Sequence, residues 1–320
     1  MLISRTPLRC SIAGGGSDLD NFTKDRNGCV VSFAINKYVY VIIKERYDDL
    51  IVLNYTQHEI VDKVSDIKHD IIRECMQYAE LGTGIEITTL ADIPSTGTGL
   101  GSSSAITIGL LNAMFAYKGI YLSGYDLARI ACVIEIDRLK KPIGRQDQYA
   151  CAIGGLQKIS FCQKDVMAWK FPARYHSVAD NLFLHFTGIT RDANKILEGQ
   201  DKNTPDNIGT LLRLVEYAGD SYDAIINGDY DKIGEILGLS WAFKASLASG
   251  ISNKDIDEII ARARDGGAIG SKICGAGGGG FLLSYVPNKE HARFREAMKD
   301  YRELKFSIDQ FGSRIIFNIQ

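Results

Sequence analysis

Residues 94–105 have the sequence PSTGTGLGSSSA, in which glycine alternates with other residues from 97 to 101 and three serines follow. The segment comes after an alternating strand at residues 84–90 and leads into a run of helically spaced apolar residues from Ser103 to Tyr117. Glycine lets backbone N–H groups approach an anion, and a helix start adds unpaired N–H groups and a positive dipole end. The segment therefore predicts a phosphate-binding loop rather than a plain connector.

Three common nucleotide-binding patterns do not fit this loop. It lacks the GK[ST] ending of a Walker A loop, no HRD or DFG segment follows downstream, and its GxGxG spacing differs from GxGxxG. We expect the following residues of the loop to bind the nucleotide: Pro94, Gly97, Gly99, Leu100, Gly101, Ser102, Ser103 and Ser104.

Two further segments are rich in glycine. Residues 273–281, ICGAGGGGF, hold four consecutive glycines before a strand, which is more than a β-bulge or a tight hairpin entry requires. We expect this backbone to approach the substrate or a nucleotide phosphate closely. Residues 9–19, RCSIAGGGSDL, run from a strand into a glycine turn that carries Asp18. The Asp18 carboxylate can accept hydrogen bonds from sugar hydroxyls or cap N–H groups of its own turn.

Composition narrows the class of protein. The chain has 320 residues, 45% of them hydrophobic and 24% charged, which is typical of a soluble globular protein. A net charge of −2 and the lack of a basic stripe argue against nucleic acid as a partner. The odd number of cysteines, seven, without a CxxC pair predicts reduced thiols and no zinc site. No signal peptide or membrane span is evident, so we expect a cytoplasmic protein that does not bind membranes.

The pattern along the chain predicts an α+β architecture of two lobes. We expect two strands or one long bent strand at 28–46, a helix from Ser123 to about Leu139, and three helical segments within 205–264. We also expect residues 281–286 and 314–317 to form a strand pair, with a helix at 289–300 between them.

The three glycine segments together resemble the signature motifs of the GHMP small-molecule kinases, in the same order and over nearly the whole chain. The resemblance implies an N-terminal lobe like ribosomal protein S5 domain 2, at residues 1–170, and a ferredoxin-like C-terminal lobe with the second glycine motif, at 171–320. It also implies ATP and Mg²⁺ as cofactors. TPLRCSIAGGGSDL, GRQDQYACAIGGL and GITRDANKIL are most similar to the heptose-phosphate kinases of this family.

That similarity implies a sugar kinase that phosphorylates the anomeric hydroxyl of D-glycero-D-manno-heptose 7-phosphate to the 1,7-bisphosphate. Other acceptors stay open, namely fucose, galactose, or a non-sugar alcohol such as mevalonate. The EHTDY pattern of galactokinases is absent, which argues against galactose. A catalytically inactive ligand-binding regulator and a decarboxylase of the same fold are further alternatives. The expected partner is a small sugar phosphate, and a homodimer stays open.

The resemblance also suggests catalytic and metal-binding residues. Asp147, in GRQDQ, resembles the family's catalytic aspartate and is our candidate base, and Arg9 matches a basic residue near the transferred phosphoryl group. Glu135 continues a helical face and is our candidate magnesium ligand, together with the hydroxyl of Ser103 or Ser104. The alternatives are a loop aspartate bonded to backbone, a surface arginine, and a glutamate in an ion pair at a helix end.

The substrate site is the least constrained by the sequence. Arginine and lysine side chains are suited to the phosphate of the acceptor, although solvated surface charge is an equal alternative for them. We expect these residues to bind the substrate: Gly14, Gly15, Gly16, Ser17, Asp18, Arg145, Gln148, Arg191, Lys195, Gly277, Gly278 and Gly279.

Overall fold

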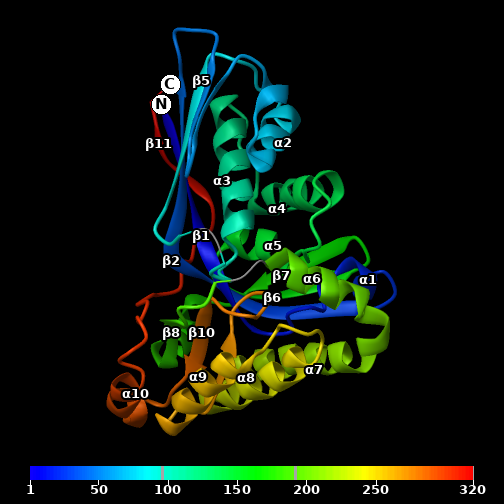
Figure 1. The fold of residues 1–320 in the computed structure, drawn as a ribbon, viewed down its shortest axis with the longest axis vertical. Coiled ribbons are helices and arrows are strands. Elements are labelled where there is room, and N and C mark those ends of the chain that lie inside the picture. Colours follow the sequence, from blue (N-terminus) through cyan, green and yellow to red (C-terminus); the bar gives the residue numbers. More distant parts are fainter. Residues whose placement is uncertain (95–96, 191–192, 320) are drawn as a thin grey trace.

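A computed structural model describes residues 1–94, 97–190 and 193–319 of the chain. An eight-stranded sheet fills one part of the molecule and a three-stranded sheet with long helices fills the other (Figure 1). The strands are β1 (Leu2–Ala13), β2 (Asn27–Glu45), β3 (Ile51–Asn54), β4 (His58–Val61), β5 (Ile85–Ala91), β6 (Leu156–Cys162), β7 (Asp165–Lys170), β8 (Leu182–Phe186), β9 (Gly270–Ile273), β10 (Phe281–Tyr285) and β11 (Arg314–Asn318). The α-helices are α1 (Asp20–Thr23), α2 (Asp70–Tyr78), α3 (Ser102–Tyr117), α4 (Gly124–Cys132), α5 (Gln146–Ile153), α6 (Ala193–Lys202), α7 (Ile208–Asn227), α8 (Tyr230–Ala245), α9 (Lys254–Asp265) and α10 (His291–Ala297).

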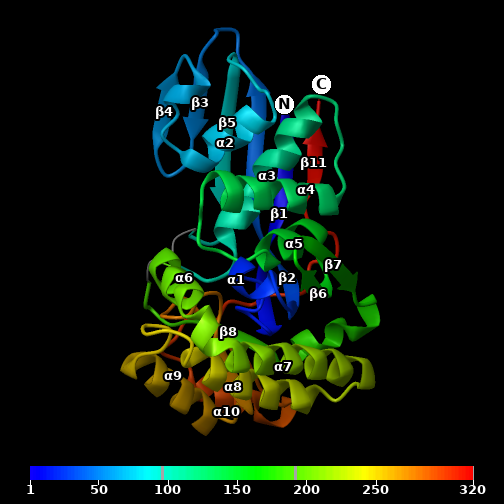
Figure 2. The same cartoon turned by 90° about the vertical axis from the view of Figure 1, so that its right-hand side faces the viewer.

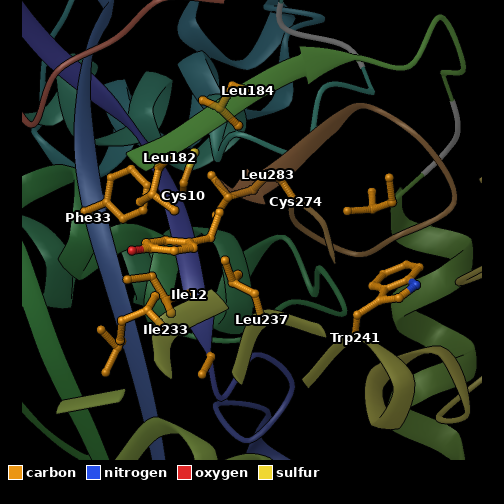
Figure 3. Packing of buried hydrophobic residues seen from close by; sticks show 14 of the residues in the cluster. Cys10, Ile12, Phe33, Leu182, Leu184, Ile233, Leu237, Trp241, Cys274 and Leu283 are labelled. Carbon is orange, nitrogen blue, oxygen red and sulfur yellow. The ribbon is translucent and has the colours of Figure 1, made fainter. Parts of the chain in front are cut away.

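β1 and β2 connect the two parts of the molecule. They pair antiparallel along most of their length, and β2 is one long strand, which settles the choice left open for residues 28–46. One half of β2 pairs with β5 and the other half with β6. Side chains from this second half pack against the three-stranded sheet, as Figure 3 shows for Phe33 next to Leu182. The two sheets therefore share one hydrophobic core.

The strand pair expected at the end of the chain is wrong. β10 pairs with β8 and β9 in the three-stranded sheet, whereas β11 pairs with β1 in the large sheet. The helix between them, α10, is present but shorter than expected. Strand pairing depends on tertiary contacts that the local pattern does not contain, so two good strand signals were joined incorrectly. The division of the chain into lobes between residues 170 and 171 stays a prediction. β11 comes after this division in the sequence but pairs with β1, which comes before it.

The helices expected from Ser123 and within residues 205–264 are present. The N-cap Ser123 of α4 accepts a hydrogen bond from the backbone N–H of Asp126 at 3.1 Å, as a capping pair does. α4 continues directly into a π-helical turn, Val133–Arg138, and Lys140 then turns the chain with a φ of +53°. α7, α8 and α9 are the three segments expected within 205–264. In Figure 2, α3 and α4 lie in front of the large sheet, and α7 to α10 gather at the other end of the molecule.

Every helix in the described ranges is too short or too polar to cross a lipid bilayer.

Candidate active site

A pocket of about 260 Å³ lies where the two glycine loops, the Gly14–Asp18 turn and the starts of α3 and α5 meet. Three glycines of the central loop line the pocket and have positive φ: Gly97, Gly99 and Gly101. Gly101 is the N-cap of α3 and has no side chain that could cap the helix, so the first N–H groups of this 16-residue helix are suited to an anionic ligand. Ser102, Ser103 and Ser104 also line the pocket.

Two predicted members of the central loop lie behind the pocket wall. Leu100 is fully buried, and its carbonyl oxygen accepts a hydrogen bond from the backbone N–H of Arg9 at 3.0 Å. Pro94 borders a separate hollow of about 320 Å³, together with Tyr55, His69 and Ile106. These residues shape the loop without facing the pocket.

The C-terminal glycine loop packs against the central loop. A Cβ on Gly275 would lie 2.7 Å from Cα of Gly99, and the N–H of Phe281 donates to the carbonyl oxygen of Thr98 at 3.1 Å. Only glycine permits such an approach between two backbones. Gly275 and Ala276 reach the pocket.

The expected substrate residues of this loop lie elsewhere. A Cβ on Gly277 would meet Ile251 at 2.7 Å, and one on Gly279 would meet the carbonyl oxygen of Ile189 at 2.6 Å. The N–H of Gly278 donates to the carbonyl oxygen of Ile251 at 2.7 Å. These three glycines pack closely against Ile251 and Ile189 and do not line the described pocket, so their assignment to the substrate site stays a prediction.

Arg9 and Asp147 form a bidentate ion pair in the pocket. Nε and Nη2 of Arg9 each donate to one carboxylate oxygen of Asp147, both at 2.6 Å. Nη1 donates to the carbonyl oxygen of Gly99 at 2.7 Å, which fixes the pair to the central loop. Burial alone would lower the pKa of Arg9, but the charge of Asp147 and their hydrogen bonds outweigh it and raise that pKa. Asp147 remains 24% exposed, toward the pocket.

Glu135 lies in the π-helical turn with its carboxylate entirely buried. It accepts hydrogen bonds from the hydroxyls of Ser103 (2.9 Å) and Ser104 (2.8 Å) and from Nε2 of Gln148 (2.9 Å). Nζ of Lys141 lies 3.5 Å from the same carboxylate and 3.1 Å from the Ser103 hydroxyl. The structure thus places Glu135 against both serines, between which the sequence left the choice open.

Asp18 connects the glycine turn to the start of α5. Its carboxylate accepts hydrogen bonds from the N–H of Gly16 (3.1 Å) and from the N–H and Nε2 of Gln146 (3.1 and 2.9 Å). Gly14 lies so close to Cys29 that a Cβ would be 1.9 Å from its carbonyl oxygen, and the Ser17 hydroxyl donates to that same oxygen at 3.1 Å. Gly14 and Ser17 therefore build the turn, whereas Gly16 and Asp18 line the pocket.

Several predicted substrate residues lie away from the pocket. Arg145 donates from Nη2 to the Thr23 hydroxyl at 2.7 Å and to the carbonyl oxygen of Gln163 at 2.5 Å, so it braces α1 instead. Gln148 faces Glu135, because neighbouring residues on a helix point in different directions and Asp147 takes the pocket side.

Lys195 and Arg191 are the other two basic candidates. Lys195 is exposed on α6 and does not line the pocket. Arg191 lies outside the described residues. The structure therefore brings none of Arg145, Gln148 and Lys195 into the described pocket.

The pocket also contains residues that the sequence analysis missed. Gln146 lies within the GRQDQ segment and Lys141 lies three residues before it, and their proximity to Asp147 in the sequence could have indicated them. Gln200 on α6 and Lys244 on α8 come from distant segments without a motif.

Comparison with known proteins is consistent with this geometry. The model of the GHMP kinase N-terminal domain matches residues 67–155, and that of the GHMP kinase C-terminal domain matches 221–302, together more than half of the chain. A D-glycero-alpha-D-manno-heptose 7-phosphate kinase of Campylobacter jejuni is 29% identical over 93% of each chain. A mevalonate kinase of Methanothermobacter thermautotrophicus is 28% identical over 68% of this chain and 70% of its own.

Solved structures show the same fold. The crystal structure of a D-glycero-D-manno-heptose 1-phosphate kinase from Bacteroides thetaiotaomicron is 24% identical, covers both chains in full and has a TM-score of 0.82. A galactokinase of Lactococcus lactis complexed with galactose is 17% identical, covers 98% of this chain and 94% of its own, and has a TM-score of 0.76. Because both family models match in order and the two-lobed fold agrees, the chain belongs to the GHMP kinase family and is an ATP-dependent kinase.

Proposed function

We propose that the protein is a sugar kinase that transfers the γ-phosphoryl group of ATP to the anomeric hydroxyl of D-glycero-D-manno-heptose 7-phosphate, giving the 1,7-bisphosphate. The observation that carries the proposal is the Arg9–Asp147 pair, which faces the open N-terminus of α3 in a single pocket. The similarity over nearly the full length to a heptose 7-phosphate kinase supports the choice of acceptor.

Each group of the pocket has a part in this transfer. The first-turn N–H groups of α3 and the backbone of the central loop bind phosphate oxygens of ATP. The acceptor oxygen forms a bond to the γ-phosphorus as the bond to ADP breaks, and its proton passes to a carboxylate oxygen of Asp147. Arg9 holds that carboxylate from the opposite side and stabilises charge on the transferred group.

Glu135, Ser103 and Ser104 are suited to a magnesium ion. Their donor set is a buried carboxylate and two hydroxyls, which are the hard oxygen ligands that Mg²⁺ prefers. The ammonium of Lys141 already lies against these oxygens, so the cluster attracts positive charge. A bound ion would neutralise phosphate charge there. We therefore propose that these three residues hold the ion of the ATP–magnesium complex.

A panel of acceptors tests the function. The purified protein is incubated with ATP and Mg²⁺ and with heptose 7-phosphate, heptose 1-phosphate, mannose, galactose, fucose or mevalonate, and ADP release is measured. We expect selective turnover of heptose 7-phosphate and a product phosphorylated at the anomeric carbon. Preference for heptose 1-phosphate would reverse the assignment of acceptor position, and preference for mevalonate would rule out the sugar.

A further inference from the structure

Gln200 is a buried amide in the pocket wall for which the protein provides no partner. Its side chain is 2% exposed and lines the pocket, yet within the described part of the chain neither Nε2 nor Oε1 makes a hydrogen bond. A buried amide without partners costs folding free energy, and most such groups in folded proteins are paired. A ligand with a hydrogen-bond acceptor in the pocket would supply the missing partner of Nε2.

The glycine turn is shaped to admit this amide. A Cβ on Gly16 would lie 2.3 Å from Nε2 of Gln200, so any larger residue would displace the side chain. The α6 helix is fixed nearby, because Nδ2 of Asn21 donates to Asp201 at 2.8 Å and the Thr204 hydroxyl donates to the carbonyl oxygen of Gln200 at 3.2 Å. The amide therefore lies at a fixed place against the turn.

Lys244 brings a positive charge to the same place. It is 5% exposed on α8 and lines the pocket, and its Nζ donates to the carbonyl oxygen of Gly275 at 2.5 Å. Nζ lies 3.4 Å from the position of a Cβ on Gly15, next to the glycine that Gln200 contacts. An ammonium and an amide N–H donor thus meet at the glycine turn.

The basic side chains of the pocket have different partners. Three basic side chains line its described part: Arg9 binds Asp147, Lys141 lies against Glu135 and Ser103, and Lys244 lies at the glycine turn. The first two belong to the reacting end and the metal-binding cluster. Lys244 is the basic group beside the glycine turn that Gln200 contacts, and it belongs to neither of these pairs.

From these observations we infer that Gln200 and Lys244 bind the phosphate group that the acceptor already carries. The inference rests on the proposed function, which supplies a phosphorylated sugar as acceptor. It assigns the acceptor phosphate to a different pair of residues than Arg145 and Lys195, which lie away from the pocket. The amide N–H and the ammonium both donate to phosphate oxygens, while Asp18 and Gln146 remain for sugar hydroxyls.

Steady-state kinetics with matched acceptors test this assignment. Heptose 7-phosphate is compared with the same heptose without the phosphate, at saturating ATP, for Gln200→Leu, Gln200→Glu and Lys244→Met. We expect kcat/KM for the phosphorylated acceptor to fall about 10-fold, 100-fold and 30-fold respectively, since bonds to a charged group are lost or a repelling charge is added. The KM for ATP and kcat/KM for the unphosphorylated heptose should change less than about 3-fold.

Control variants separate binding from folding. Gln77→Leu and Lys232→Met make the same changes at exposed positions on α2 and α8 and should leave all constants unchanged. Lys244→Arg keeps the charge and should stay within about 5-fold of the wild type. Gln200→Leu should unfold at the same or a higher temperature than the wild type, because it removes the unpaired amide.

The outcomes distinguish this inference from the proposed function. Equal losses for both acceptors, or no loss for the phosphorylated one, would overturn the inference while leaving a heptose kinase intact. If the wild type prefers another sugar phosphate, the proposed acceptor fails, and the same comparison with and without phosphate still decides the role of Gln200 and Lys244. Turnover of unphosphorylated sugars alone would overturn both.

Discussion

The two ends of the pocket differ in how their polar groups are satisfied. At the reacting end, Arg9, Asp147 and Glu135 already have hydrogen-bonding partners within the protein. At the glycine turn, the buried amide of Gln200 has none among the described residues. The reacting end is therefore organised before any ligand arrives, which lowers the cost of stabilising a transition state. The other end is completed by the acceptor, which makes it the place where acceptors are distinguished.

The largest effect should come from the reacting end. Asp147→Asn removes the carboxylate that takes the acceptor proton, and we expect kcat to fall at least about 1,000-fold. ATP binding, measured by isothermal titration calorimetry, should stay within a few-fold, because the phosphate contacts come from the central loop. Near-normal turnover would show that another group takes the proton or that none needs to.

The metal-binding cluster should show the next largest effect. Glu135→Gln removes the buried negative charge beside Ser103 and Ser104, so the Mg²⁺ concentration for half-maximal activity should rise about 10- to 100-fold. Glu235→Gln, at an exposed ion pair on α8, is the matched control. An unchanged magnesium titration in Glu135→Gln would remove Glu135 from the proposed metal site.

A substitution at Gly16, which lies against Gln200, should weaken acceptor binding. Gly16→Ala places a Cβ where Nε2 of Gln200 lies, at a φ of +105°, so the KM for the acceptor should rise about 10-fold with little change for ATP. Gly219→Ala in α7, where a Cβ meets nothing within 4 Å, should leave both constants unchanged. If the two variants behave alike, the close approach of Gln200 has no effect on acceptor binding.

The smallest expected effect is on stability and concerns Lys272 on β9, which bonds to β1. Buried Lys272 donates from Nζ to the carbonyl oxygen of Ser11 at 2.9 Å, and burial lowers the pKa of Lys272 from its usual 10.5 to about 8. Between pH 8 and about 10.5 the unfolded chain then holds more protons than the folded one, so this group makes stability rise with pH.

Urea unfolding of the wild type and of Lys272→Met, at pH 7.5, 8.5 and 9.5, measures this contribution. The difference in free energy of unfolding should shift in favour of the wild type by about 1–2 kcal/mol over that range. A difference that stays constant with pH would mean that Lys272 does not lose its proton in this window.

Prediction from sequence succeeded where the determining contacts are local. The central loop and α3 followed from adjacent residues, and the pairing of Glu135 with the serines followed from helical spacing together with the family resemblance. Gln148 was misassigned because its direction depends on where α5 begins, which fixes which neighbour faces the pocket. The segment alone did not reveal that start.

The acceptor end could not be predicted because it is assembled from distant segments. Gln200 lies on α6 and Lys244 on α8, and both reach the turn that follows β1 only through the packing of the two sheets. Neither belongs to a glycine motif, and a single glutamine or lysine in an amphipathic helix resembles any surface residue. Arginine was favoured for phosphate on chemical grounds, yet Arg145 makes its bonds to Thr23 and Gln163 instead.

The pairing of β11 with β1 has a consequence for how the protein is made. Leu2 lies opposite Asn318 in the large sheet, so one of the earliest strands to leave the ribosome gains its outer neighbour only after the residues of the second lobe have been translated. Until then β1 exposes an unpaired edge, which can pair with other chains. The N-terminal lobe therefore cannot complete its sheet before the C-terminal lobe has been synthesised. Loss of a few residues around β11 would leave the nascent protein prone to aggregation.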